Sequence, residues 1–315
     1  MERVATLLSA RVDHDAVMWA QALRTLGYEV RSADRLDANR DRSPNDGDLV
    51  VAHDPLLLDQ PPALSHIVRW RDLPGQRRDL GRRCELDRFT DALHVTPTLH
   101  ARRELEARGV LRVTCLPDAF DLDPTPGDRN HTRAHLGFGP DDIVVFQPTI
   151  AAARKNVAGS VRYVNDLAKY IRNRPLRLWI KGPIADDHAD LFGKVIDRCE
   201  VPVTVTEAPT VADAFAACDA VIFPAPADAF GDVVLEGVAH RRPVVCSDFP
   251  VLSELVAGGI RILPIDDPTA LVKFLGRPES TRRTHLDATA RRARVSYSHD
   301  DFAARVGELI ALVTR

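Results

Sequence analysis

The stretch AVIFPAPADAFGDVVLE, residues 220–236, contains a complete strand–loop–helix unit. Its opening run of apolar and β-branched residues predicts a buried strand over 220–225. The Phe230-Gly231 turn then precedes an apolar segment with helical spacing, which predicts a helix over 230–240. A strand that leads through a loop into a helix is the repeating unit of parallel α/β folds.

The same alternation extends from this segment in both directions. Short apolar runs predict further strands at residues 3–9, 28–30, 49–53, 66–70, 92–96, 113–117, 142–148, 176–182, 201–206, 243–248 and 260–265. Helices are predicted between them, among others at residues 15–27 and 210–218. The strand segments are rich in β-branched residues and do not alternate with polar ones, which is typical of parallel strands covered on both faces.

The chain contains enough residues, 315, for two domains of ordinary size. Residues 121–140 are polar and rich in proline and glycine, which predicts a linker. Near the C-terminus, Ser298 and Asp301 resemble a helix-capping pair ahead of apolar residues at helical spacing: Phe302, Val306, Leu309, Ile310 and Val313. The prediction is an α/β fold with two Rossmann-like, doubly wound domains facing a central cleft. The domains are expected at residues 1–125, completed by a helix at 298–315, and at residues 126–297.

Composition argues against several classes of protein. There are 42 lysines and arginines against 45 acidic residues, a net charge of −3, whereas a general nucleic-acid binder is basic. The five cysteines are scattered and the eleven histidines lack metal-ligand spacing, so neither a disulfide framework nor a metal site is expected. No apolar run approaches the roughly 18 residues needed to cross a bilayer, and no signal-peptide pattern begins the chain. We expect a soluble, cytoplasmic protein with no nucleic-acid partner.

The first lysine of the chain, Lys155, follows the strand predicted at 142–148. Arg154, Lys155 and Asn156 lie where a helix is expected to begin. Two adjacent cations together with the free N–H groups of a helix start can bind a diphosphate. The alternative is an ordinary solvated helix start. Neither a G-x-G-x-x-G motif nor a P-loop is present to offer a more familiar phosphate site.

Two carboxylates flank the turn at Phe230-Gly231. Asp228 lies in the loop before the turn and Glu236 lies in the helix after it. Gly231 permits a close approach of the backbone to a ligand. A carboxylate at the position of Glu236 could accept hydrogen bonds from the two hydroxyls of a ribose, although Glu236 taken alone also fits an exposed helix residue.

This pair of acids, separated by seven residues and followed by the strand at 243–248, resembles the donor-site signature of retaining family 4 glycosyltransferases, the glycosyl transferases group 1. Members of that family have the two-domain GT-B fold. Other segments of the chain are similar to the family in the same order: residues 48–55, 94–98, 116–121, 147–149, 154–156 and 212–219.

The resemblance implies a hexosyltransferase-like enzyme that is metal-independent and retains the anomeric configuration. The donor would be a UDP- or GDP-sugar, used as a co-substrate with no further cofactor, and the acceptor a small molecule or glycan. By position, Lys155 with Arg154 would hold the diphosphate, Glu236 the donor ribose, and Asp228 would face the donor sugar. The other donor-side residues implied are Glu207 beside the base, and Phe230, Gly231, Asp232 and Val233 near the phosphates.

The chain departs from the family pattern at four places. The glycine-rich loop that the family has after its first strand is missing. Ile150 occupies the position, five residues before Lys155, where the family usually has an arginine. Asp228 replaces the usual glutamate and is one methylene shorter. Arg71-Asp72 stands where the first domain commonly has His-Asp after a strand. Two alternatives therefore stay open: a non-catalytic pseudo-glycosyltransferase that acts as a binding partner, and a nucleotide-sugar epimerase or phosphorylase of the same fold.

The acceptor side is expected in the first domain. His53 beside Asp54, at the carboxyl end of the strand at 49–53, could position an acceptor hydroxyl and take part in catalysis. The alternative is a histidine hydrogen-bonded to a nearby loop carbonyl. Arg71 and Asp72 are also predicted to bind the acceptor. Residues 69–88 hold seven arginines and four acidic residues, a pattern that favours a solvated helix over a face that docks on anionic membrane.

Overall fold

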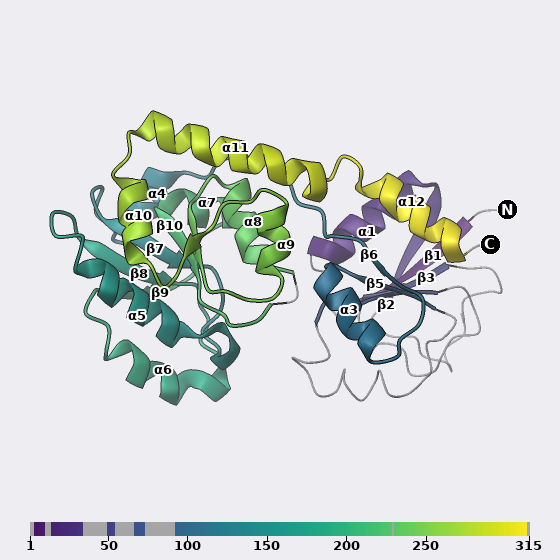
Figure 1. Ribbon diagram of the computed structural model, residues 1–315, viewed down its shortest axis with the longest axis horizontal. Helices are drawn as coiled ribbons and strands as arrows, with labels where there is room; N and C mark the ends of the chain where they lie inside the picture. The colour runs from purple at the N-terminus through teal and green to yellow at the C-terminus, as the bar shows by residue number, and fades with distance from the viewer. Residues whose placement is uncertain are drawn as a thin grey trace. The chain divides into compact units, whose positions relative to one another are not determined.

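The computed structural model describes residues 3–9, 14–33, 49–53, 66–72, 92–228 and 230–313. The chain forms two compact units. Unit 1 comprises Met1–Ala119 together with Tyr297–Arg315, and unit 2 comprises Phe120–Ser296. Each unit is built on its own parallel sheet with helices packed against it (Figure 1), which confirms the predicted doubly wound α/β class.

The sheet of unit 1 has the strand order β2-β1-β3-β4-β5-β6, and all the pairings are parallel. Its described strands are β1 (Arg3–Leu8), β2 (Tyr28–Ala33), β3 (Leu49–Ala52), β4 (His66–Arg69), β5 (Leu93–Thr96) and β6 (Val113–Cys115). Each coincides with a strand predicted from the sequence. Because the chain passes from β1 to β2 on one side and then to β3 on the other, the strand order reverses between β1 and β3.

Helices cover both faces of this sheet. On one face α1 (His14–Thr25) and α12 (Phe302–Val313) lie side by side (Figure 1), and Trp19 of α1 meets Phe302 of α12 edge-on with ring centroids 6.0 Å apart. The other face packs against α3 (Leu99–Ala107). The apolar residues predicted for the C-terminal helix are all buried, at Phe302, Val306, Leu309, Ile310 and Val313.

The start of that last helix was predicted wrongly. The Ser298 hydroxyl accepts a hydrogen bond from the Asp300 N–H at 3.0 Å, so it closes a turn ahead of the helix. The helix itself begins at Phe302, four residues after Ser298, and the backbone of Asp301 accepts from the N–H of Arg305. The polar residues therefore form a local turn that resembles a helix cap in sequence.

The sheet of unit 2 has the strand order β12-β11-β10-β7-β8-β9, again fully parallel. Its described strands are β7 (Ile143–Gln147), β8 (Leu176–Ile180), β9 (Val203–Val205), β10 (Ala220–Phe223), β11 (Val244–Cys246) and β12 (Leu263–Pro264). Counted from β7 along the chain, the order across the sheet is 3-2-1-4-5-6, the Rossmann order. The order reverses between β7 and β10.

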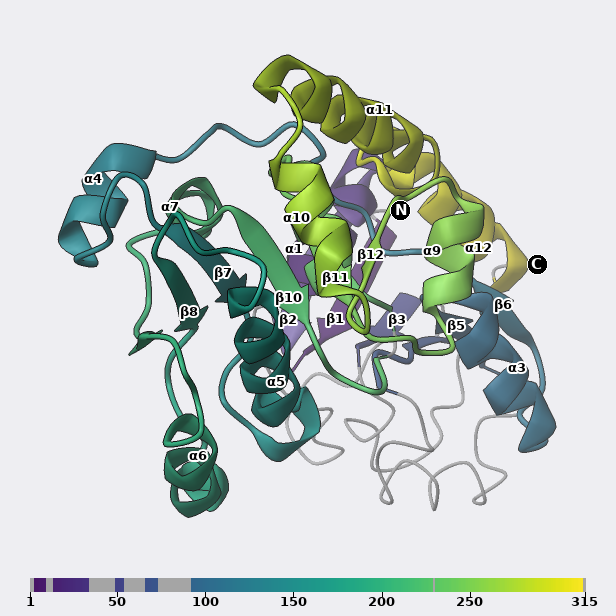
Figure 2. The same ribbon diagram turned by 60° about the vertical axis from the view of Figure 1, so that its left-hand side comes forward.

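The two faces of the unit 2 sheet are covered by different helices. The helices α5 (Val157–Ala168), α6 (Ala189–Ile196) and α10 (Pro268–Leu275) share one apolar core, and Figure 2 shows α5 and α10 next to each other. On the opposite face, Phe215 of α7 (Val211–Ala217) packs edge-on against Phe146 of β7, with ring centroids 6.0 Å apart. The helix α8 (Asp232–Ala239) lies so close to β11 that a Cβ on Gly237 would be 2.5 Å from Val244 Cγ2.

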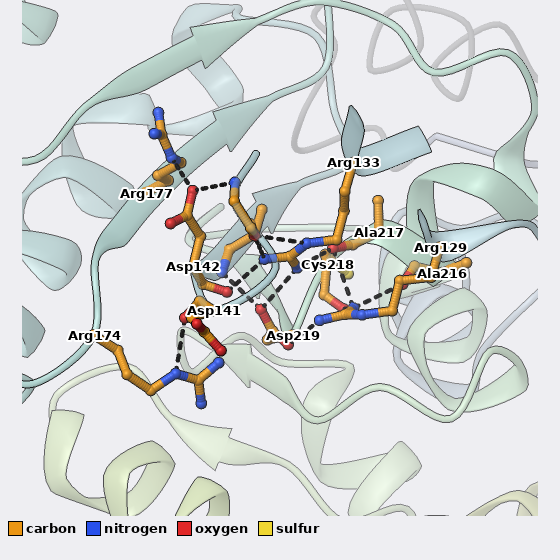
Figure 3. Close-up of polar contacts among 12 residues, drawn as sticks. Arg129, Arg133, Asp141, Asp142, Arg174, Arg177, Ala216, Ala217, Cys218 and Asp219 are labelled. Carbon is orange, nitrogen blue, oxygen red and sulfur yellow. Dashed lines mark hydrogen bonds and ion pairs between the residues drawn. The ribbon is translucent and has the colours of Figure 1, made fainter. Parts of the chain in front are cut away.

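The predicted linker at residues 121–140 contains a helix, α4 (Arg129–His135), that the sequence analysis missed. Two arginines of α4 bind the C-terminal end of α7 (Figure 3). Arg133 is 3% exposed and donates to the carbonyls of Ala217 at 2.8 Å, Gly139 at 2.7 Å and Asp142 at 2.6 Å. Arg129 donates to the Asp219 carboxylate at 2.7 Å. The sequence predicted a linker here because α4 is polar and has no long apolar stripe. Ion pairs and hydrogen bonds hold this helix in place instead.

Unit 2 ends with α9 (Leu252–Ala257), α10 and the 19-residue helix α11 (Glu279–Tyr297). The helix α11 was not predicted, since its polar, arginine-rich sequence buries only a few small residues, including Ala290 and Ala293. Within the described ranges, none of the helices combines the length and the apolar character that a membrane crossing needs.

Candidate functional site

In a doubly wound sheet, ligands bind beyond the carboxyl ends of the strands at the point where the strand order reverses. In unit 2 that point lies between β7 and β10. The loops that follow these two strands are joined there, because the Asn156 side-chain amide donates to the Pro224 carbonyl at 2.8 Å. The predicted donor-side residues Lys155 and Asp228 belong to these two loops.

Lys155 lies in a tight turn that the core of unit 2 holds in place. Residues Ala153–Lys155 form one turn of 3-10 helix, and Asn156 adopts a left-handed conformation, with φ 52°, before α5 begins at Val157. Buried Gln147 donates to the Lys155 carbonyl at 3.3 Å and accepts from the Ser160 hydroxyl at 2.7 Å. The helix thus starts after the predicted Arg-Lys-Asn triplet rather than within it.

Lys155 and Asp228 form an ion pair. The Lys155 Nζ lies 3.4 Å from Asp228 Oδ2 and 5.3 Å from the ring centroid of Phe223, and the two charged side chains are 13% and 19% exposed. The other oxygen of Asp228 accepts from the backbone N–H groups of Phe230 at 3.1 Å and Gly231 at 2.8 Å. Asp228 therefore orders the loop with one oxygen and orients Lys155 with the other. Arg154, the neighbouring predicted cation, is exposed.

The turn at Gly231 requires a glycine. Its φ is 91°, and a Cβ there would lie 2.8 Å from Leu255 Cδ1. The helix α8 begins at the next residue, Asp232, without a side-chain cap. Its first N–H groups and its dipole create a local positive potential suited to an anion. Asp232 and Val233, both predicted donor-side residues, form the first turn of this helix.

A cavity of about 410 Å³ lies at the carboxyl edge of the same sheet, and we call it the β7–β9 cavity. Its lining residues come from the ends of β7 and β8, from the loop after β9 and from α7 and α8: Phe146, Pro148, Lys181, Glu207, Ala208, Pro209, Thr210, Val211, Ala214, Phe215 and Glu236. A volume of this size is typical of a small-molecule site. The predicted base-binding loop at Glu207 and the predicted ribose-binding Glu236 thus meet in one cavity.

The carboxyl of Glu236 has an unusual protonation equilibrium. Burial and, to a smaller extent, the nearby Asp232 carboxylate raise its pKa to about 7, while Lys181 acts in the opposite direction. Glu236 is therefore poised to change charge near neutral pH. Lys181 was not predicted as a site residue. Its signal in the sequence is its position directly after the strand at 176–180, at the same sheet edge as Pro148.

In unit 1, His53 lies in a buried ionic cluster. His53 follows β3 and is 4% exposed, and its Nδ1 lies 3.2 Å from an oxygen of Asp15, which is 2% exposed. Arg69, fully buried, lies 3.4 Å from the same oxygen and also pairs with Asp118. Burial alone would raise the pKa of Asp15, but Arg69 and His53 together lower it below its ordinary value. The acid that faces His53 in the described structure is thus Asp15, from the start of α1.

The remaining acceptor-side predictions are only partly described. Arg71 Nε lies 3.7 Å from the Asp15 carboxylate, with its side chain 30% exposed, and Asp72 is half-buried. Asp54 lies outside the described residues, as does most of the arginine-rich segment at 69–88. Asp15 and His53 follow β1 and β3, the two strands between which the order of the unit 1 sheet reverses. Within the described part of the chain, no group of three His, Cys, Asp or Glu side chains is placed to hold a metal ion.

Residues 142–277 match the family model described as Glycosyl transferases group 1. The match contains the sheet of unit 2, the Lys155–Asp228 pair and the β7–β9 cavity. The match covers less than half of the chain and lies within unit 2.

Curated relatives and solved structures are similar to the chain. The D-inositol 3-phosphate glycosyltransferase of Nocardia farcinica is 28% identical over 203 residues, which cover 60% of this chain and 45% of that protein. The chain therefore matches less than half the length of that relative. By fold, it is similar to Anabaena Alr3699/HepE in complex with UDP and glucose, with a TM-score of 0.74, 14% identity, and coverage of 99% and 100% of the two chains. The sucrose-phosphate synthase of Thermosynechococcus elongatus gives a TM-score of 0.73 at 16% identity, over 99% of each chain. These likenesses confirm the predicted GT-B fold.

Within the segment that matches glycosyl transferases group 1, the structure groups the predicted residues into two places. Lys155, Asp228, Gly231 and the start of α8 lie around the loops after β7 and β10. Glu207 and Glu236 line the β7–β9 cavity. Phe230 is 3% exposed and stacks on Phe120, with ring centroids 5.8 Å apart, so its side chain supports the loop from inside unit 2.

Proposed function

We propose that this chain is a metal-independent, retaining glycosyltransferase that moves a sugar from a UDP- or GDP-sugar to a small-molecule or glycan acceptor. The observation that carries the proposal is the pairing, at one sheet edge, of a cavity of about 410 Å³ with an oriented lysine and an uncapped helix start. A nucleoside needs the first feature and a diphosphate needs the other two.

Charge accounts for the proposed roles on the phosphate side. As the sugar leaves, negative charge grows on the diphosphate oxygens, so cations and N–H groups already held in place stabilise the transition state more than the ground state. Lys155 is held by Asp228 and by the ring of Phe223, and the first turn of α8 begins beside the same loop. These groups can act without a large rearrangement of the loop.

The nucleoside would occupy the β7–β9 cavity. Glu236 offers a carboxylate to the ribose hydroxyls, and Glu207 lies in the loop that would face the base. The comparisons favour UDP as the nucleotide, since the similar Anabaena protein forms a complex with UDP and glucose. The relatives named D-inositol 3-phosphate glycosyltransferase favour a polar hydroxylated acceptor.

A non-catalytic binding protein is the second candidate, and Ile150 is the observation that favours it. Its side chain is 37% exposed at the position where the family resemblance leads us to expect a phosphate-binding arginine. The two candidates differ in turnover and not in binding.

A panel of UDP- and GDP-sugars, tested first by thermal shift and then for hydrolysis or transfer, separates the possibilities. A true donor at 100 times its Kd should stabilise the protein by about 2.7 kcal/mol. Stabilisation with turnover supports the enzyme, and stabilisation without turnover under any acceptor supports the binding protein. Failure of every nucleotide sugar to stabilise the protein contradicts both.

Donor affinity is expected to rise as the pH passes through 7. The folded-state pKa of Glu236 is raised to about 7, so the unliganded carboxyl is protonated below that pH. Ribose hydroxyls donate hydrogen bonds most favourably to the ionised form, so the donor binds more tightly above pH 7 and lowers the pKa of Glu236. The measurement is the Kd of the donor nucleotide between pH 5.5 and 8.5. Glu236→Gln should bind weakly with no such rise; the same rise in this variant would exclude Glu236 as its source.

An arginine at position 150, where the family resemblance leads us to expect one, should strengthen donor binding. Ile150→Arg is expected to lower the Kd of the donor diphosphate about tenfold, because a charge-assisted hydrogen bond contributes about 1.5–3 kcal/mol before the cost of ordering the arginine is subtracted. The side chain of Ile150 is partly exposed, so the substitution leaves the core intact. Calorimetric titration compares this variant with Ile150→Gln, which has a polar but uncharged side chain. Equal affinities in the two variants would show that this position does not face the diphosphate.

A further inference from the structure

A second cavity of unit 2, of about 510 Å³, shares no lining residue with the β7–β9 cavity, and we call it the α11 cavity. It lies between the segment that follows α9 and the helix α11. Its polar lining consists of Arg261, His285 and Arg292, and its apolar lining includes Val256, Ile262 and Leu263. None of these residues has a role in the proposed transfer of a sugar.

The polar side chains that line the α11 cavity have hydrogen-bond donors left to offer a ligand. Arg261 Nη1 lies 3.0 Å from His285 Nδ1. An arginine can only donate, so Nδ1 of His285 must accept, and the remaining proton of the neutral imidazole is on Nε2. Arg261, Arg292 and the Nε2–H of His285 thus present donors to the cavity without a matching acceptor among them.

The charges around His285 all have the same sign. In the described structure the charged groups that act on it are Arg261, Arg277 and Arg292; these, after burial, lower its pKa below the ordinary value. The nearby acid of α11, Asp287, is occupied by Arg241, whose Nε lies 3.2 Å from it. Arg261 and Arg292 are exposed, so water and salt weaken the repulsion between these like charges, and an anion bound among them removes what is left of it.

The apolar lining of the α11 cavity favours a ligand that also has an apolar part. Val256 is 51% exposed, and Ile262 and Leu263 are only half-buried, although they adjoin the three polar groups. The stem of Arg292 packs over Gly259, since a Cβ on that glycine would lie 2.7 Å from Arg292 Cδ. An inorganic ion would use the charged side of the cavity and leave the apolar side in water.

We propose that the α11 cavity binds a phosphate ester with an apolar substituent, the phosphate by Arg261, Arg292 and His285 and the substituent by Val256, Ile262 and Leu263. A tetrahedral phosphate supplies several acceptor oxygens for donors that converge from different directions, and arginines favour it. The site belongs to unit 2 alone and does not depend on the proposed transfer reaction.

The test follows the His285 ring signals by NMR while butyl phosphate is added to the full-length protein, with inorganic phosphate as the comparison. Both should shift these signals, and butyl phosphate should bind at least about tenfold more tightly because part of its chain leaves water. Arg261→Gln and Arg292→Gln should each weaken binding about ten- to hundredfold. Arg291→Gln is the matched control, since it removes the same charge from the same helix at a residue that does not line the cavity.

The remaining outcomes decide the proposal. Equal weakening by Arg291→Gln would show general attraction to a basic helix and overturn the site, as would unshifted His285 signals or equal affinity for the two phosphates. Lys155→Ala should leave butyl phosphate binding unchanged, so failure of the proposed glycosyltransferase activity and failure of this site can be told apart.

Binding to vesicles that contain phosphatidic acid tests whether the phosphate ester is a soluble molecule or a lipid. Binding of the soluble ester alone identifies a small metabolite as the source, and vesicle binding that Arg261→Gln abolishes identifies a lipid headgroup.

Discussion

Lys155→Ala is expected to lower kcat/KM for sugar transfer by about 100- to 1,000-fold, the range seen when one preorganised group facing a developing charge is removed. Lys155 Nζ is held 3.4 Å from Asp228 Oδ2, and its side chain is 13% exposed, so it is oriented before any donor binds. Alanine removes the cation and leaves Asp228 as an uncompensated negative charge beside the proposed diphosphate position. Steady-state kinetics with the donor found by the nucleotide-sugar panel gives the measurement.

Two control variants show whether the loss comes from the site. Lys169→Ala removes an exposed lysine that pairs with Asp166, its neighbour on the surface of unit 2, and should leave kcat/KM unchanged. Arg154→Ala tests the other predicted cation, which is exposed, and should have a smaller effect than Lys155→Ala because its side chain is not held in place. Full transfer activity in Lys155→Ala would remove this lysine from the mechanism.

Arg133→Ala is expected to lower the free energy of unfolding of unit 2 by about 3–5 kcal/mol, as when one partner of a buried charged network is deleted. The guanidinium of Arg133 donates to the carbonyls of Ala217, Gly139 and Asp142, and alanine would leave these acceptors buried without it. Asp219 would also lose one of its two arginines. Native-state hydrogen exchange at the β7 amides reports the unfolding of this unit separately from unit 1.

The matched control is Arg174→Ala, which removes an exposed arginine that donates to a single carbonyl, that of Asp141, at 2.8 Å (Figure 3). Its effect should stay within about 0.5 kcal/mol, as for other surface substitutions. If Arg133→Ala fails to fold, Arg133→Lys retains the charge while losing the planar fork, and should give an intermediate loss. A loss under about 1 kcal/mol for Arg133→Ala would show that water replaces the arginine at these carbonyls.

The local sequence pattern was sufficient to predict the strands of the two sheets. Every described strand coincides with a predicted strand segment. The strands β3, β7 and β10 are buried along their whole length, and the apolar runs that such burial needs are visible in a short window. The helices α4 and α11 were missed for the opposite reason. Their surfaces are polar, and they are stabilised by ion pairs such as Arg129 with Asp219, whose partners are 90 residues apart.

The donor-side residues could be predicted from the sequence for a similar reason. Asp228, Gly231 and Glu236 fall within one strand–loop–helix unit, so their spacing along the chain is nearly their spacing in the fold. The position of Lys181 in the site could not be predicted in this way. It reaches the cavity with Glu236 only because β8 lies beside β7 in the sheet, and strand order is a property of the whole unit.

The sequence alone established the parallel α/β class, the division into two sheets, and the loop in which an acid, a glycine and a second acid follow a strand. These features depend on neighbours along the chain. The tertiary structure decided the Lys155–Asp228 pair, the raised pKa of Glu236, and the burial of His53 against Asp15. Each of these depends on distances and burial between segments that are remote in sequence, and such distances exist only once the sheets have assembled.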